Sequence, residues 1–205
     1  MIDAAATQAN ETLVAYAELL RTAGVERGLI GPREVDRIWD RHILNCAVAS
    51  ELVPNGASVT DVGSGAGLPG LVWAIIRPDI SLVLVEPLLR RSTFLTEICE
   101  ELGLSGQVTV LRARAEDLVS SWPGSQIVTA RAVAPMAKLL GWTMPLVAPG
   151  GALLALKGAS AAEEVAAASA ELAKFGAGEP EIVQCGVGVV DPPTTVVKVP
   201  KRPAR

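Results

Sequence analysis

The fold class follows most directly from one short segment, Val59-Thr60-Asp61-Val62-Gly63-Ser64-Gly65-Ala66-Gly67-Leu68-Pro69-Gly70. A β-branched run leads straight into three alternating glycines and then into a segment of helical composition. Such a turn directs backbone amides and a helix N-terminus toward a bound ligand. A dinucleotide fingerprint would carry glycine at the third position after Gly65, but Leu68 stands there and Gly67 comes one residue early. The spacing GxGxG therefore disfavours a cofactor with a pyrophosphate, and a purely structural glycine turn is the alternative.

Strand and helix patterns alternate on both sides of this turn. Short β-branched runs predict strands at 58–62, 81–85, 107–111, 126–130, 151–156, 181–190 and 194–199. Helices are expected at 7–23, 33–52, 68–77, 89–103, 116–121, 136–147 and 159–175. The last two strands are joined by Asp191-Pro192-Pro193, which is too short for a crossover helix, so they should pair antiparallel. We expect an α/β, Rossmann-like fold with a seven-stranded, mostly parallel sheet and a C-terminal antiparallel hairpin.

Composition agrees with that fold and limits the function. Of the 205 residues, 50% are apolar, 20% are charged and 3% are aromatic. Enough apolar surface is present to form a core, which excludes a disordered chain, and the scarcity of aromatics favours helices packed on a parallel sheet. The formal net charge of −4 excludes a general polycation, so nucleic acid would meet only local basic patches. We expect one domain over 1–205, with a helical extension (1–55), a core (56–200) and a frayed basic tail (201–205).

Several candidate site residues lie where the predicted strands end. Glu86 follows the second strand and is placed to accept hydrogen bonds from ribose hydroxyls, although a surface pair with Arg90 or Arg91 is the alternative. Asp61 would contact the amino acid end of a cofactor or merely order the glycine turn. The backbone and side chain of Ala115-Glu116 would contact an adenine, and Arg131 would hold a carboxylate, a phosphate or a guanine edge.

The predicted helix 33–52 carries a basic stripe beside an apolar arc. At 100° per residue the apolar arc contains Val35, Ile38, Trp39, Ile43, Cys46 and Ala49, and it includes His42. Arg33, Arg37, Arg41 and Asn45 follow one another on another face. This stripe is either a phosphate-binding surface or an ordinary solvated face with intrahelical pairs such as Arg33–Asp36. His42 is either a partly buried structural side chain or a substrate contact.

Other residue patterns exclude further classes of function. Cys46, Cys99 and Cys185 are far apart and form no CxxC pair, so we expect neither a disulfide framework nor a thiolate zinc site. The single histidine excludes a multi-histidine metal site, so no metal is expected. The longest uncharged run is broken by proline and glycine, so no membrane span is expected. Without a leader-like N-terminus, we expect the protein in the cytoplasm.

The sequence also resembles a known family. The resemblance is carried by Trp39-Asp40-Arg41-His42-Ile43-Leu44-Asn45-Cys46, the glycine turn 61–70, Glu86-Pro87-Leu88-Leu89-Arg90-Arg91-Ser92-Thr93-Phe94-Leu95, Arg114-Ala115-Glu116 and Arg131-Ala132-Val133-Ala134. These segments look like the RsmG family of small-subunit rRNA guanine-N7 methyltransferases, over about residues 13–200. Asn45-Cys46 stands where many relatives carry Asp-Ser, so Asn45 is given no essential acid role.

The resemblance implies a cofactor, a substrate and a set of site residues. It implies methyl transfer from S-adenosylmethionine to a guanine in the 530 loop of 16S rRNA, in the small ribosomal subunit, by a protein that we expect to be a monomer. The expected cofactor-binding residues are Asp61, Gly63, Gly65, Leu68, Glu86, Ala115, Glu116 and Arg131. The expected RNA-binding residues are Arg33, Arg37, Arg41, His42, Arg90, Arg91, Lys201 and Arg202. Arg131, with His42 and Asn45, would position the reactants.

Guanine N7 carries an in-plane lone pair, so methylation there needs no proton removal, and the lack of an obvious base in the sequence fits that chemistry. Three other classes remain open. A small-molecule methyltransferase would share the cofactor residues, but it would not need the arginine stripe. A nicotinamide-dependent reductase is disfavoured by Gly67 and Leu68, and a noncatalytic ribosome-associated module would keep the basic patch but could lose the pocket.

Overall fold

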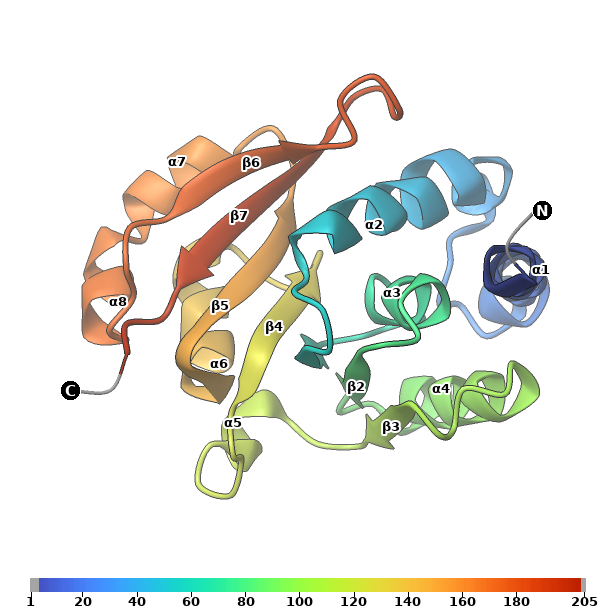
Figure 1. Cartoon of the computed structure of the whole chain (residues 1–205), viewed down its shortest axis with the longest axis horizontal. Coiled ribbons are helices and arrows are strands. Elements are labelled where there is room, and N and C mark those ends of the chain that lie inside the picture. Colours follow the sequence, from blue (N-terminus) through green and yellow to red (C-terminus); the bar gives the residue numbers. More distant parts are fainter. Residues whose placement is uncertain (1–3, 204–205) are drawn as a thin grey trace.

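The computed structural model describes residues 4–203, and within them seven strands form one sheet (Figure 1). The strands are β1 (Ser58–Val62), β2 (Ser81–Val85), β3 (Val108–Leu111), β4 (Ser125–Arg131), β5 (Val147–Lys157), β6 (Glu181–Cys185) and β7 (Thr194–Pro200). Their order is β3-β2-β1-β4-β5-β7-β6. The first five strands pair in parallel, and β7 pairs antiparallel with both β5 and β6. The expected mostly parallel sheet with a C-terminal hairpin is confirmed.

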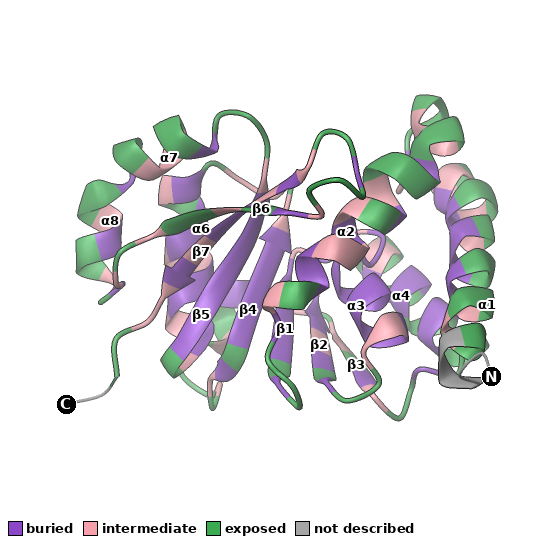
Figure 2. Cartoon of the chain, turned by 45° about the horizontal axis from the view of Figure 1, so that its top comes forward, coloured by how far each residue is buried: buried purple, intermediate pink, exposed green. Residues whose placement is uncertain are grey.

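Two hydrophobic cores cover the two faces of this sheet, as the buried residues in Figure 2 show. One core includes side chains of α1 (Ala4–Leu19), α2 (Leu44–Ala49), α3 (Gly70–Ile76) and α4 (Leu89–Glu101). The other includes side chains of α5 (Ala115–Leu118), α6 (Met136–Thr143), α7 (Ala161–Ala167) and α8 (Ser169–Lys174). This three-layer arrangement leaves the carboxyl ends of the parallel strands for binding, as in other doubly wound sheets.

The segment predicted as one helix over 33–52 is helical but irregular. It begins as a 3-10 turn at Pro32–Arg37, continues as a π segment at Ile38–Ile43, becomes α2 and ends as a 3-10 turn at Ser50–Leu52. A uniform 100° per residue does not apply to such a segment, because 3-10 and π turns hold different numbers of residues. Trp39, which was expected in the apolar arc, is therefore 37% exposed.

Other boundaries also differ from the predicted ones. The helix expected over 159–175 divides at Ala168, a buried residue with φ of −100° that separates α7 from α8. The helix expected from residue 68 begins only at Gly70, after Pro69. The strand expected over 181–190 stops at Cys185, because Gly186 adopts φ of +70° against Val48 and turns the chain.

Candidate active site

The glycine turn between β1 and α3 is held by the end of the neighbouring strand β2. The amide of Gly63 donates to the carbonyl of Val85 at 2.8 Å, and the amide of Gly65 donates to Glu86 Oε2 at 3.0 Å. Gly63 has φ of +71°, and a Cβ there would lie 2.9 Å from Val133 Cγ2. A side chain at this position would be strained and crowded, so the turn requires glycine.

Glu86 is fixed by this arrangement. Its carboxylate is buried, with 1% of the residue exposed, and Oε1 also accepts the amide of Leu88 at 3.0 Å. Arg91 Nη1 lies 3.9 Å from Oε2. The alternative of a surface glutamate is therefore wrong, because this carboxylate is buried. A carboxylate offers about four lone-pair directions, so Glu86 retains capacity to accept bonds from a ligand while it holds the turn.

Glu86 and Gly63 line a cleft of about 670 Å³ at the carboxyl ends of β1, β2 and β3. Its other walls come from Pro87, Leu88, Arg91, Arg112, Ala113, Arg114, Asp117, Ala132 and Val133. Ala115 is buried and Glu116 is exposed, and the lining instead includes Arg114 and Asp117 on either side of them. The sequence indicated this loop correctly but did not indicate which of its residues face the cleft.

Asp61 lies behind the glycine turn, at 0% exposure. Its Oδ2 accepts the amide of Gly70 at 3.1 Å, whereas Oδ1 is buried without a hydrogen-bond partner. Burial raises the pKa of this carboxyl to about 7. Asp61 therefore orders the turn, as one interpretation of the sequence held, and still presents an unsatisfied acceptor. Leu68 is buried in the same turn, 7% exposed.

One residue that binds the turn was missed by the sequence analysis. Tyr16 of α1 is fully buried and its hydroxyl donates to the carbonyl of Ala66 at 2.9 Å. The N-terminal helix thereby packs on the turn and reaches a segment fifty residues later in the chain. No local pattern around Tyr16 could have indicated this, because the contact depends on how α1 packs against α3.

A second cleft, of about 1220 Å³, adjoins the first, because Ala132 and Val133 line both. From the irregular helical segment, its lining includes Glu34, Arg37, Arg41, His42 and Asn45. From the carboxyl ends of β4 and β5 and from the β6–β7 hairpin it includes Arg131, Lys157, Asp191, Pro192 and Thr194. The structure thus brings four sequence-predicted residues, Arg37, Arg41, His42 and Asn45, to the same cleft as Arg131.

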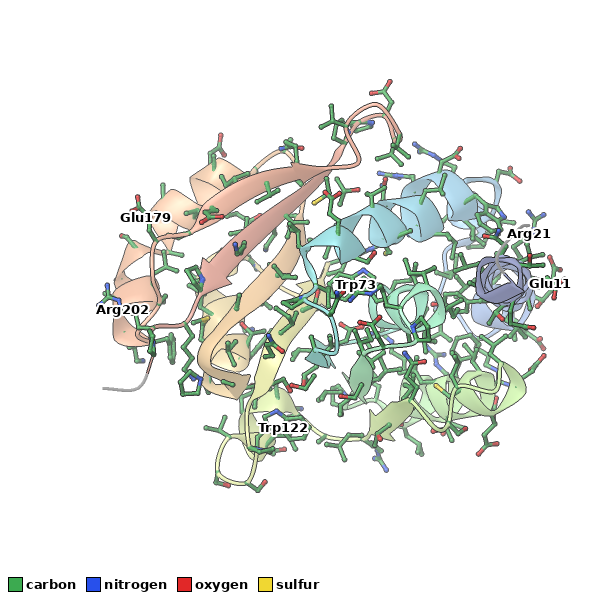
Figure 3. All side chains as sticks on the ribbon, viewed as in Figure 1. Glu11, Arg21, Trp73, Trp122, Glu179 and Arg202 are labelled. Atoms are coloured by element: carbon green, nitrogen blue, oxygen red, sulfur yellow. The ribbon has the colours of Figure 1, made fainter. Side chains whose placement is uncertain are left out.

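Arg131 is held by the helical segment that packs above it. Its Nη1 donates to Cys46 Sγ at 3.1 Å, and its Nη2 contacts His42 Nδ1. Trp73 of α3, labelled in Figure 3, donates from Nε1 to the carbonyl of Cys46 at 2.7 Å and fixes that residue in turn. Burial lowers the pKa of His42, and the adjacent guanidinium of Arg131 lowers it further.

The loop after β4 is held at its far end by an ion pair. Lys157 Nζ donates to the carbonyl of Ala134 at 2.8 Å and to Glu164 Oε2 at 2.7 Å, and Glu164 also accepts the amide of Met136. Within this loop Ala132 adopts φ of 55°, an uncommon conformation for a residue with a side chain. The sequence analysis missed Lys157 and Glu164, which fix the wall that the two clefts share.

The remaining residues that were expected to bind RNA divide into those near the clefts and those at the opposite edge of the sheet. Arg90 and Arg91 lie at the start of α4, with Arg91 in the smaller cleft, whereas Arg33 is exposed and lines neither cleft. Lys201 pairs with Ala177 and donates from Nζ to the carbonyls of Met144 and Val147, so the expected frayed tail is wrong at this residue.

Lys201 therefore lies at the amino end of β5, opposite the clefts, and Figure 3 places Arg202 on that side beside α8. Both residues were expected to bind RNA, but the structure does not bring them to the clefts. Arg205 lies outside the described residues.

The three cysteines are buried and free. Among residues 4–203, no group of three or more His, Cys, Asp or Glu side chains is placed to hold a metal ion. In the same part of the chain, no helix is both long and apolar enough to span a membrane.

Known structures with similar folds indicate the class. A SAM-dependent O-methyltransferase from Thermotoga maritima has a TM-score of 0.60 at 14% identity, covering 84% of this chain and 71% of that one. A SAM-dependent methyltransferase from Aquifex aeolicus has a TM-score of 0.57 at 17% identity, covering 83% and 98%. The fold, with its glycine turn and strand-end acid, is that of the Rossmann-like S-adenosylmethionine-dependent methyltransferases.

Sequence comparisons identify the family within that class. Residues 9–189 match the family described as rRNA small subunit methyltransferase G. The ribosomal RNA small subunit methyltransferase G of Salinispora arenicola is 59% identical over 191 residues, covering 91% of this chain and 79% of the relative. That of Streptomyces coelicolor is 58% identical over 186 residues, covering 91% and 77%. The chain belongs to the rRNA small subunit methyltransferase G family, and it is an S-adenosylmethionine-dependent rRNA methyltransferase.

The residues present fit this cofactor. The unpartnered Oδ1 of Asp61 is a buried acceptor without a donor, and it suits the ammonium of the methionine portion. The carboxylate of Glu86 lines the smaller cleft and suits a ribose diol. These two groups, at the ends of adjacent strands, would bind the two halves of the cofactor.

Proposed function

We propose that this protein transfers the methyl group of S-adenosylmethionine to N7 of a guanine in the 530 loop of 16S rRNA. The smaller cleft would hold the cofactor, through Gly63, Glu86 and the loop 112–117. The larger cleft would hold the guanine and its flanking phosphates. Arg131 lines the larger cleft and adjoins Ala132 and Val133, which line both, so the transferred methyl would pass beside it.

The observation that carries this proposal is the state of His42, the single histidine in the sequence. Its Nδ1 contacts Arg131 and its Nε2 contacts Glu34 Oε2 at 3.1 Å, so both ring nitrogens are occupied. Lys157, another side chain of the larger cleft, is likewise bound to Glu164 and to a carbonyl. A nucleophile that needs no deprotonation suits such a site.

Guanine N7 is such a nucleophile. The bound cofactor supplies a methyl group on a positively charged sulfur. Attack by N7 on this methyl would form the N7–carbon bond as the sulfur–carbon bond breaks and would pass the positive charge to the guanine, so no residue of the chain would have to accept a proton. The chain's own contribution is then to orient the base and exclude water, an effect that can supply roughly 7–11 kcal/mol of a barrier.

Phosphate contacts are proposed for Arg37 and Arg41 at the larger cleft and for Arg90 and Arg91 near the smaller one. We propose further that the protein acts in the cytoplasm as a monomer with a single domain. The single domain is supported by the one seven-stranded sheet, which carries a hydrophobic core on each face.

The direct test is to incubate the purified protein with S-adenosylmethionine and small ribosomal subunits lacking this modification, and to identify the product nucleoside by mass spectrometry. We expect 7-methylguanosine at one position of the 530 loop. Methylation of an exocyclic amine or a ribose hydroxyl would contradict the assignment of N7. If the protein methylates a small molecule and unmodified RNA does not inhibit that reaction, the assignment of the substrate is contradicted.

A further inference from the structure

His42 lies between an acidic and a basic side chain, Glu34 and Arg131, which come from different parts of the fold. Glu34 belongs to the 3-10 turn Pro32–Arg37, and Arg131 ends β4. The imidazole bridges them, with Nε2 3.1 Å from Glu34 Oε2 and Nδ1 against Arg131 Nη2. Its side chain is only 13% exposed, so water competes little for either contact.

The two partners determine where the proton of the imidazole lies. A guanidinium only donates hydrogen bonds, so Nδ1 must accept and carries no proton. An ionised carboxylate only accepts, so Nε2 must donate and carries the proton. The ring is therefore neutral with its proton on Nε2. The lowered pKa of His42 agrees: burial, Arg131 and Arg41 disfavour the charged ring, although Glu34 favours it.

Glu34 organises more than the histidine. Its other oxygen, Oε1, accepts from Arg41 Nη1 at 3.3 Å, so one carboxylate holds two consecutive residues of the helical segment. Glu34 also lines the larger cleft with Arg41, His42 and Arg131. Since Cys46 Sγ accepts from the other arm of the guanidinium, Arg131 is held between two acceptors, and the orientation of one of them depends on Glu34.

We propose that Glu34 is a positioning residue of this site: it holds the imidazole of His42 in the Nε2–H form so that Nδ1 holds Arg131 where the two clefts meet. The catalytic part of this inference rests on the proposed function. The orientation and protonation of His42 do not rest on the proposed function, and they can be measured separately.

That readout is the nitrogen spectrum of the single histidine. In protein labelled with ¹⁵N-histidine, we expect one imidazole N–H signal near neutral pH, assigned to Nε2, with Nδ1 unprotonated. The signal should persist in E34Q, whose amide oxygen can still accept. In E34A the proton has no protein partner and exchanges with water, so the signal should be lost. A proton on Nδ1 in the unaltered protein, or an Nε2–H signal unchanged in E34A, would overturn the proposal.

Kinetics test whether Glu34 acts through His42. We expect E34A to lower the single-turnover rate of rRNA methylation by about tenfold, because a loosened Arg131 misplaces the reactants, and E34Q to restore most of the rate. At saturating RNA, where a weakened phosphate contact of Arg41 does not limit the rate, the same E34A change should have no further effect in a His42→Ala background, since Glu34 and His42 then act as one unit. If the fold loss in rate of the double variant equals the product of the two single losses, the proposal is overturned.

Glu97→Ala is the matched control. Glu97 also forms an exposed ion pair with an arginine, Arg27, but it lines neither cleft. We expect E97A to keep the rate, and a loss equal to that of E34A would overturn the proposal by showing that any lost ion pair suffices. If the unaltered protein does not methylate rRNA, the proposed function fails, while the histidine spectrum still decides the role of Glu34.

Discussion

At the scale of single residues, the site combines two buried carboxylates that both accept backbone amides of the glycine turn. Burial raises the pKa of Asp61 to about 7. Both carboxylate oxygens of Glu86 accept hydrogen bonds from backbone amides. The sequence predicted both positions from the strand ends. It could not predict their burial, because burial depends on how the β4 loop and α1 close over the turn.

Asp61 should make stability depend on pH in a definite direction. Its folded pKa of about 7 lies above its ordinary value of 3.8, so the folded protein binds the extra proton. The stability it contributes is therefore complete below about pH 4 and is lost as pH rises through about 7. We expect Asp61→Asn to flatten this decline and to raise the unfolding free energy at pH 8 by on the order of 2–4 kcal/mol in the cofactor-free protein.

Urea unfolding at pH 5 and pH 8 measures this effect. Asp79→Asn is the control, because hydrogen bonds from Arg77 and Gly56 lower the pKa of that exposed carboxyl. Asp79 stays ionised across both conditions, so its replacement should leave the pH dependence unchanged. An Asp61→Asn variant with the same decline as the unaltered protein would show that Asp61 does not titrate in this range.

Glu86 should contribute to cofactor affinity beyond its structural role. We expect Glu86→Gln to weaken S-adenosylhomocysteine binding by about tenfold, because neutral hydrogen bonds to a ribose are weaker than charge-assisted ones. Glu86→Ala should in addition destabilise the fold by about 1–3 kcal/mol, since it removes the charge-assisted hydrogen bonds that this carboxylate accepts from the amides of Gly65 and Leu88. Calorimetric titration and thermal unfolding separate the two effects. Unchanged affinity in Glu86→Gln would limit this carboxylate to holding the turn.

At the scale of elements, the helical segment 32–52 shows what a sequence period can and cannot predict. The apolar periodicity correctly placed Ile38, Ile43, Cys46 and Ala49 inside. The basic stripe was predicted as one surface, but Arg33 and Arg37 lie in a 3-10 segment, where a step of four residues does not return to the same face. Arg37 and Arg41 line the larger cleft, whereas Arg33 does not.

This division gives a prediction with an internal control. We expect Arg37→Ala to lower RNA affinity and to reduce the slope of log affinity against log salt by about 0.7–0.9, the loss of one phosphate contact. Arg33→Ala removes the same charge from the same 3-10 segment, outside the cleft, and should change the slope much less. Filter binding to rRNA at several salt concentrations measures both. Equal effects would mean that RNA contacts the whole stripe and not the cleft.

The hairpin illustrates a different limit of sequence reasoning. Val187 and Val189 suggested a strand through residue 190, yet both are more than 70% exposed, because the chain has already turned at Gly186. β-Branched residues favour positions on a half-buried strand surface, but they do not determine where the backbone turns. The path was set by Val48 of α2, which lies 2.7 Å from where a Cβ at residue 186 would be.

At the scale of the whole molecule, alternation of strands and helices was enough to predict the class of fold. It was not enough to place β7 between β5 and β6, nor to show that the helical segment 32–52 packs beside β7, where Thr194 Oγ1 donates to the carbonyl of Asn45 at 3.1 Å. These long-range contacts form the larger cleft. The residues proposed to bind the cofactor follow from local motifs, whereas those that orient Arg131 follow only from tertiary packing.

The central claim is that methyl transfer here needs no base. Its most direct measurement is the single-turnover rate of rRNA methylation as a function of pH, with RNA and S-adenosylmethionine both saturating. We predict a rate that is nearly flat from about pH 6.5 to 9, the range in which a histidine or perturbed lysine base would titrate. A steep rise near neutrality that His42→Ala abolishes would make His42 a general base and contradict attack by guanine N7.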